Sequence, residues 1–207
     1  MPRALWVLLG ALILTGHLAG CGDKPAEGDA PAAETAEKAA DEAAEKAEAP
    51  APARPAAPKL DFPGTADGAK ALLAKFVAEG ADTAALTTGL RPTSADYAAV
   101  FVGDAAKKAE AAYGPAWEAG QLVVRPKAGQ TEVLLSQATT DQLKAGDEAA
   151  KAFPGGYAKV VDQLKPGLTL YRFKFVEPGK ELGMAFDGLV YVNGRWAIFP
   201  KPWRALR

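Results

Sequence analysis

Reactive side chains are almost absent from this sequence. Its 207 residues include one His and one Cys, and both, His17 and Cys21, stand within the first 21 residues. The chain beyond them has two Ser, Ser94 and Ser136, and neither stands in a G-x-S-x-G or S-x-x-K motif. Beyond residue 21 the sequence therefore excludes His-based catalytic triads and zinc sites built on His or Cys, and one cysteine cannot form a disulfide within the chain.

An excess of charge of one sign and the common cofactor motifs are also lacking. Lys and Arg number 24 against 25 Asp and Glu, so nucleic acid is not expected as a partner. There is no Walker A sequence, no G-x-G-x-x-G and no D-x-D-x-D calcium loop, and we predict no cofactor and no metal site. Carboxylate chemistry stays open, with Glu132 and Asp187 as conceivable members, but nothing in their spacing couples them. We predict no catalytic residues and expect a protein that binds rather than an enzyme.

The first 21 residues have the pattern of an export signal. A short cationic start with Arg3 precedes a mostly apolar stretch at residues 5–14. That stretch is too short to span a bilayer core of about 30 Å, which needs about 20 apolar residues. It is followed by Leu18-Ala19-Gly20-Cys21, which resembles the lipobox of bacterial lipoproteins. An ordinary secretory signal with a chance cysteine, or a buried N-terminal helix, is the alternative.

The lipobox resemblance implies a lipid anchor. It implies removal of residues 1–20 as a signal peptide, a diacylglycerol thioether on Cys21 and, usually, an acyl chain such as palmitate on the new N-terminus. The chain would then be held in the cell envelope, with its domain outside the cytoplasm. Gly22 stands where inner-membrane lipoproteins carry Asp, and Asp23 comes one place later. The resemblance therefore favours the outer membrane over the inner membrane.

Residues 21–60 are expected to form a disordered or partly helical tether. Residues 22–59 contain no Val, Ile, Leu, Met, Phe, Tyr or Trp, and carry nine acidic and five basic residues. Such a segment buries too little apolar surface to offset the entropy of ordering. Ala-rich residues 32–49 favour a transient helix and the prolines that follow favour an extended spacer. An alanine-based coiled coil with a partner is the alternative.

Residues 61–207 are expected to form one α+β domain, with N-terminal helices packed on a curved, mainly antiparallel sheet. Apolar spacing predicts a helix over 69–79, and Thr93 with Asp96 predicts a capping box at the start of the next. A further helix is expected from Asp104 to about residue 113, closed by Gly114-Pro115. Strands are expected at 121–125 and 131–137, and a short helix at about 157–164.

The C-terminal part predicts a three-stranded meander. Asn193-Gly194 between β-rich runs is typical of a two-residue type I′ hairpin, which places Tyr191 opposite Trp196 and Gly188 opposite Phe199. Residues 177–180 predict the preceding turn, with Glu177 paired to Lys180.

These registers sort the strand residues onto two faces. One, the expected core face, collects Tyr171, Phe173, Phe175, Leu182, Met184, Phe186, Val190, Val192 and Phe199. The other collects Leu170, Arg172, Lys174, Asp187, Leu189, Tyr191, Trp196 and Ile198, with Arg172 and Asp187 as a diagonal cross-strand pair. Its mixture of aromatic, aliphatic and charged groups suggests a ligand-facing surface with Arg172, Asp187, Tyr191 and Trp196 as candidate binding residues. A helix covering the apolar part of this face is the alternative.

The order of elements weakly resembles NTF2-like and cystatin-like domains, in which helices pack on a bent sheet. That resemblance implies a cavity but transfers no catalytic motif. The C-terminal residues 199–207 combine aromatic and basic side chains, which suits either a glycan or anionic-polymer site or a Trp203 that closes the edge of the core.

The sequence thus predicts a membrane-anchored envelope lipoprotein with a non-enzymatic binding domain. Its partner would be an envelope protein, a glycan or a small ligand. An NTF2-like ligand-binding domain or a carboxylate-based enzyme is the alternative, and a purely structural spacer is a third hypothesis.

Overall fold

The computed structural model describes residues 60–207, which belong to one compact unit with an α+β fold, the class predicted from the sequence. The predicted signal peptide, Cys21 and residues 21–59 of the predicted tether lie outside the described residues. Among residues 60–207, no helix has both the length and the apolar character needed to cross a membrane.

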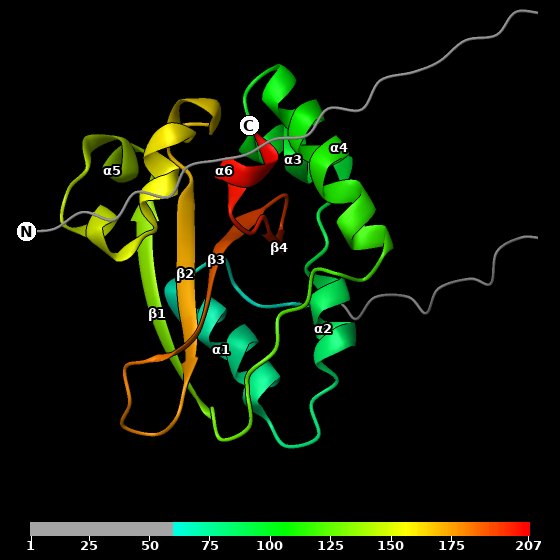
Figure 1. The fold of residues 1–207 in the computed structure, drawn as a ribbon, viewed down its shortest axis with the longest axis vertical. Coiled ribbons are helices and arrows are strands. Elements are labelled where there is room, and N and C mark those ends of the chain that lie inside the picture. The colour runs from blue at the N-terminus through cyan, green and yellow to red at the C-terminus, as the bar shows by residue number, and fades with distance from the viewer. Residues whose placement is uncertain (1–59) are drawn as a thin grey trace, which may run out of the picture. The chain divides into compact units, whose positions relative to one another are not determined.

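Within residues 60–207, four helices precede the first strand, and a four-stranded antiparallel sheet has the order β1-β2-β3-β4 (Figure 1). The helices are α1 (Ala66–Val77), α2 (Thr83–Gly89), α3 (Ser94–Val100), α4 (Asp104–Glu118), α5 (Thr140–Ala145) and α6 (Pro202–Ala205). The strands are β1 (Glu132–Thr139), β2 (Thr169–Val176), β3 (Gly183–Val192) and β4 (Arg195–Ile198). Three short 3-10 helices, η1 (Ala149–Ala152), η2 (Gly155–Lys159) and η3 (Val161–Gln163), lie between α5 and β2.

The helix α1 follows its local sequence signals. The Thr65 hydroxyl caps its first turn by accepting a hydrogen bond from the Gly68 backbone N–H at 3.1 Å. Leu72, Leu73 and Phe76 are buried on one side of the helix. The predicted helix over 69–79 is therefore confirmed, and it begins three residues earlier because the cap stands at Thr65.

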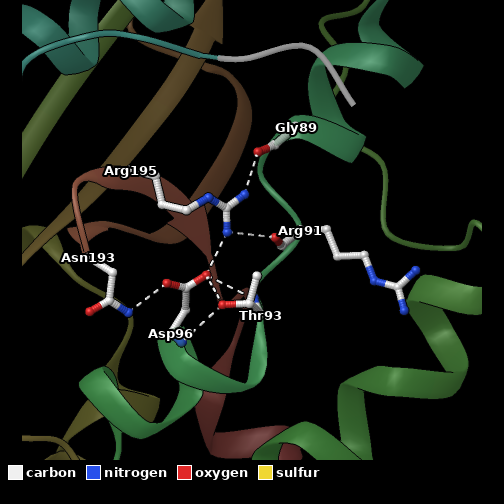
Figure 2. A network of polar contacts seen from close by, with 6 residues as sticks. All are labelled: Gly89, Arg91, Thr93, Asp96, Asn193 and Arg195. Atoms are coloured by element: carbon white, nitrogen blue, oxygen red, sulfur yellow. Dashed lines mark hydrogen bonds and ion pairs between the residues drawn. The ribbon is translucent and has the colours of Figure 1, made fainter. Parts of the chain in front are cut away.

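The predicted capping box of α3 is also confirmed, and its carboxylate does more than cap the helix. Asp96 accepts from the Thr93 backbone N–H at 2.8 Å, and its fully buried side chain also accepts from Asn193 Nδ2 at 2.9 Å and Arg195 Nη1 at 2.5 Å (Figure 2). The Arg195 guanidinium donates further to the carbonyl oxygens of Gly89 and Arg91. This network joins the connection between α2 and α3 to the β3–β4 hairpin.

The β3–β4 hairpin has the register predicted from Asn193-Gly194. Tyr191 faces Trp196, and Asn193 and Gly194 have φ of 51° and 74°, as a type I′ turn requires. The preceding turn differs from the prediction. Lys180 N–H does bond to Glu177 O, but the strands first pair at Val176 and Gly183, so residues 177–182 form a longer loop.

Leu182 consequently lies in this loop with 87% of its surface exposed, and its predicted place on the core face is wrong. The turn at Pro178-Gly179 closes without aligning the two strands that flank it. The register between β2 and β3 is therefore set by packing along the strands.

A β-bulge in β3 overturns the predicted division of the sheet into two faces. The pairing steps from Phe173–Phe186 to Tyr171–Leu189, so β3 has one extra residue at this point. Gly188 there has φ of 81°, and one inserted residue reverses which side every later side chain takes. Leu189, Tyr191, Trp196 and Ile198 therefore share a face with Tyr171 and Phe173, whereas Val190, Val192 and Phe199 take the opposite face.

Both faces of the sheet are covered. On one side, α1 packs Phe76 against Phe175 with ring centroids 6.1 Å apart, and α1 runs behind the strands in Figure 1. On the other side, Phe199 packs edge-on against Tyr97 and Phe101 from the α3 region. The aromatic residues of the meander are thus divided between two halves of the core.

Three further local predictions are wrong. The helix α4 continues through Gly114-Pro115 to Glu118, because Tyr113 and Trp117, one turn apart, are both buried against the core. Residues 121–125 pair with no strand within residues 60–207. The segment around Tyr157 and Leu164 forms 3-10 turns rather than one helix.

Candidate functional site: a pocket between α4, β3 and α6

The four candidate binding residues predicted from the sequence do not form one surface. Trp196 is 1% exposed, and its indole N–H donates to the Phe62 carbonyl at 3.1 Å. Tyr191 packs against the Trp196 ring at 5.3 Å on the same side of the sheet. Arg172 points to the other side, where it donates to the Ala152 carbonyl of η1 at 2.8 Å. The apolar half of the predicted surface is therefore covered core, the alternative stated above.

Asp187 lies on the same side of the sheet as Arg172 and is an internal hydrogen-bond acceptor. Its Oδ1 accepts from the Tyr157 hydroxyl at 3.2 Å and from the Lys201 backbone N–H at 2.9 Å. Burial raises the pKa of the Asp187 carboxyl, although these two hydrogen bonds and the charges of Lys201 and Arg172 act against the rise. The predicted pair of Arg172 and Asp187 thus interacts electrostatically, but no ion pair forms between them.

The second carboxylate considered for catalysis, Glu132, lies elsewhere. It stands at the start of β1, where its Oε2 accepts from the Gly179 backbone N–H at 3.3 Å. Asp187 lies in β3 beside η2 and the N-terminus of α6. The structure therefore does not bring these two carboxylates together.

A pocket of about 480 Å³ lies beside Asp187 at the edge of β3, and residues from both faces of the sheet line it. Its lining comes from α4, residues 121–124, the first half of β3, Ile198 and the C-terminal segment with α6. The residues are Thr87, Ala112, Tyr113, Trp117, Gln121, Leu122, Val123, Val124, Met184, Ala185, Phe186, Asp187, Ile198, Pro200, Lys201, Arg204 and Ala205. This volume is within the range of small-molecule sites, roughly 300–1,000 Å³.

The continuation of α4 beyond Pro115 supplies one wall. An internal proline costs a helix about 3 kcal/mol, which the buried side chains of Tyr113 and Trp117 offset here. Tyr113 also fixes the helix to the C-terminal segment, since its hydroxyl donates to the Pro200 carbonyl at 2.9 Å. The Trp117 indole N–H has no hydrogen bond of standard geometry.

Residues 121–124 supply another part of the wall, and a side chain of α2 helps to hold them. The Val124 backbone N–H donates to the Thr87 hydroxyl of α2 at 3.0 Å, and Gln121 N–H donates to the Ala116 carbonyl at 2.9 Å. The β-rich composition of this segment predicted a strand, but the Val124 backbone N–H bonds to the Thr87 hydroxyl and not to a neighbouring strand. Sequence patterns do not reveal such a partner.

The floor of the pocket includes a free strand edge. The strand β4 pairs only with Leu189–Val192. Among the described residues, Gly183–Asp187 of β3 therefore have β2 on one side and no strand on the other. The bulge at Gly188 separates these two parts of β3. Because β4 is shorter than β3, space remains beside the first half of β3, and Met184 and Phe186 line the pocket there.

Two cations stand at the C-terminal side of the pocket. Lys201 and Arg204 are exposed, and their side chains make no hydrogen bond or ion pair within residues 60–207. Lys201 has φ of 55°, an unusual conformation for a residue other than glycine, and its N–H bond to Asp187 holds it there. The only sign of these two cations in the sequence was the run of Pro and basic residues at 199–207. In the structure Trp203 of this run packs on Tyr157 with ring centroids 5.2 Å apart, at the edge of the core.

Comparison of the chain with protein-family models, with curated proteins and with solved structures gives no match. The resemblance to NTF2-like and cystatin-like domains therefore stays a prediction. No group of three or more His, Cys, Asp or Glu within residues 60–207 is arranged to hold a metal ion.

Proposed function

We propose that this chain is a bacterial envelope lipoprotein whose domain binds a small ligand in the pocket between α4, β3 and α6. The anchor is Cys21, and the outer membrane is favoured over the inner membrane because Gly22 follows it. This part of the proposal rests on the motif Leu18-Ala19-Gly20-Cys21.

The pocket carries the ligand-binding part. It has the volume of a small-molecule site, a mainly apolar lining that includes Trp117 and Phe186, and polar groups confined to a few positions. We do not extend the proposal to catalysis, because Asp187, the acid of the pocket, is engaged by Tyr157 and Lys201.

Two alanines of α4 allow a matched test. Ala112 lines the pocket and Ala111 does not, while both are exposed. The mature chain, residues 21–207, is used with Cys21→Ser so that no acyl chain of its own competes. It is titrated with the neutral apolar fluorophore N-phenyl-1-naphthylamine, whose emission rises when it leaves water.

We expect saturable binding that Ala112→Trp weakens by about tenfold or more, since an indole would fill the pocket, and that Ala111→Trp leaves within about twofold. Absence of saturable binding, or equal binding by both variants, would overturn the proposed site. Circular dichroism of both variants checks that the fold is kept.

A further inference from the structure

We infer that the ligand of this pocket is an amphiphile with a single anionic headgroup and an aliphatic chain, that is, a fatty acid or a monoacyl phospholipid. The inference rests on the proposed ligand-binding function and specifies its ligand class. It follows from how apolar and charged groups are divided around the pocket.

The interior of the pocket favours an aliphatic chain. Side chains from four separate parts of the fold, namely Trp117, Val124, Phe186 and Ile198, present apolar surface to it. The hydrogen-bonding groups that discriminate a polar ligand such as a sugar are few among these wall residues. Burial of methylene groups is therefore the main available source of affinity.

The charged groups of the pocket favour an anion. Lys201 and Arg204 both line it and are exposed, and neither side chain forms a hydrogen bond or ion pair within residues 60–207. The charge of Lys201 acts on Asp187, but no ion pair joins the two. The one acid of the lining, Asp187, is 5% exposed and has its Oδ1 occupied by two donors. An anionic headgroup thus meets two exposed cations that form no ion pair within the described residues, whereas a cationic headgroup meets a single, mostly buried carboxylate.

The backbone holds the two cations in place. Three contacts fix the segment that carries them: Tyr113 hydroxyl to Pro200 O, Lys201 N–H to Asp187, and Arg204 N–H to Lys201 O at 2.8 Å. The left-handed conformation of Lys201 is maintained by the second of these. A fixed backbone lowers the entropy lost when the cations bind a headgroup.

The test is displacement of the same neutral fluorophore from the mature Cys21→Ser chain by chain-matched ligands below their micellar concentrations. Tetradecanoate is compared with tetradecanol and tetradecyltrimethylammonium, and with dodecanoate. We expect tetradecanoate to bind at least about tenfold more tightly than the alcohol, and the cation most weakly. Two fewer methylenes should weaken binding by about 15-fold, from about 0.8 kcal/mol per methylene. Monotetradecanoyl glycerophosphate, run in parallel, tells whether a phosphate or a carboxylate is preferred.

Charge variants provide the second arm. Arg204→Gln and Lys201→Gln are each expected to weaken tetradecanoate binding by about three- to tenfold while leaving tetradecanol unchanged. Arg207→Gln is the matched control, because Arg207 lies in the same segment and does not line the pocket. It should leave both ligands unchanged.

The outcomes separate the two proposals. If the fluorophore binds in the pocket but the anion and the alcohol displace it equally, or if Arg204→Gln and Arg207→Gln behave alike, the ligand class is wrong and the proposed function stands. If the fluorophore does not bind, or binds without regard to Ala112→Trp, the proposed function fails and the ligand class with it.

Discussion

At the scale of single residues, two buried aspartates are stabilised in opposite ways. Burial disfavours the charge of Asp96, but hydrogen bonds from Thr93, Asn193 and Arg195 outweigh burial and lower its pKa below 3.8. Burial dominates at Asp187 and raises its pKa above 3.8. Donors reach both oxygens of Asp96 (Figure 2). At Asp187 both hydrogen bonds end on Oδ1.

The same substitution should therefore have opposite effects at the two sites. Asp96→Asn places an amide NH2 where a donor already points, and we expect it to lower the free energy of unfolding at pH 7 by about 1–3 kcal/mol. In Asp187→Asn the amide oxygen can accept both existing bonds and the buried charge is removed, so stability at pH 7 should be equal or higher. Urea unfolding measures both.

The stability conferred by these two carboxyls should also depend on pH in opposite ways. The advantage of wild type over Asp96→Asn should be present above pH 3.8 and be lost as pH falls through the lowered pKa of the folded state. For Asp187, the raised pKa means that folding favours the protonated carboxyl, so any disadvantage of wild type relative to Asp187→Asn should be absent at low pH and grow as pH rises through the folded value. Equal losses in both variants at pH 7 would contradict this assignment.

At the scale of elements, the bulge in β3 decides which side chains form the core and which line the pocket. A Cβ at Gly188 would lie 2.0 Å from the Phe199 carbonyl oxygen, so close approach of the backbone requires glycine at this position. The two backbones are joined here by a hydrogen bond of 2.9 Å from the Phe199 N–H to the Gly188 carbonyl oxygen.

Gly188→Ala is expected to lower the free energy of unfolding by about 3 kcal/mol or more, because strain at positive φ and a backbone clash act together. Gly194→Ala is the matched control. Gly194 also has positive φ, 74°, but nothing lies within 4 Å of the added carbon, so only strain of about 1–2 kcal/mol is expected. Equal losses in urea unfolding would show that the close approach at Gly188 costs nothing.

At the scale of the whole molecule, the proposed anchor and the proposed pocket depend on different parts of the chain. The pocket lies within residues 60–207, while the proposed acylation site, Cys21, lies outside the described residues. An acylated chain would work at a membrane, where amphiphiles of the inferred class are abundant. The two parts can therefore be tested one at a time.

Cys21→Ala should remove the acyl mass from the mature protein and release the chain from the membrane fraction, since two or three acyl chains hold a protein far more firmly than none. Intact-mass spectrometry and fractionation of lysed cells measure this. Thr35→Ala, a change within the predicted tether, is the control and should stay acylated and membrane-bound. An acylated, membrane-bound Cys21→Ala protein would refute the lipobox prediction.

The sequence alone determined what depends on neighbouring residues. The capping box of Thr93 and Asp96 and the Asn193-Gly194 hairpin were predictable because the groups that bond are a few residues apart. The scarcity of His, Cys and Ser likewise limited the chemistry before any fold was known.

Tertiary structure decided what depends on distant partners. Pro115 stays inside α4 because Trp117 is buried, residues 121–124 stay out of the sheet because Thr87 binds Val124, and one bulge at Gly188 moves Trp196 into the core. The pocket arises from these three features together. No local pattern encodes it, because each depends on a packing energy gained far along the chain.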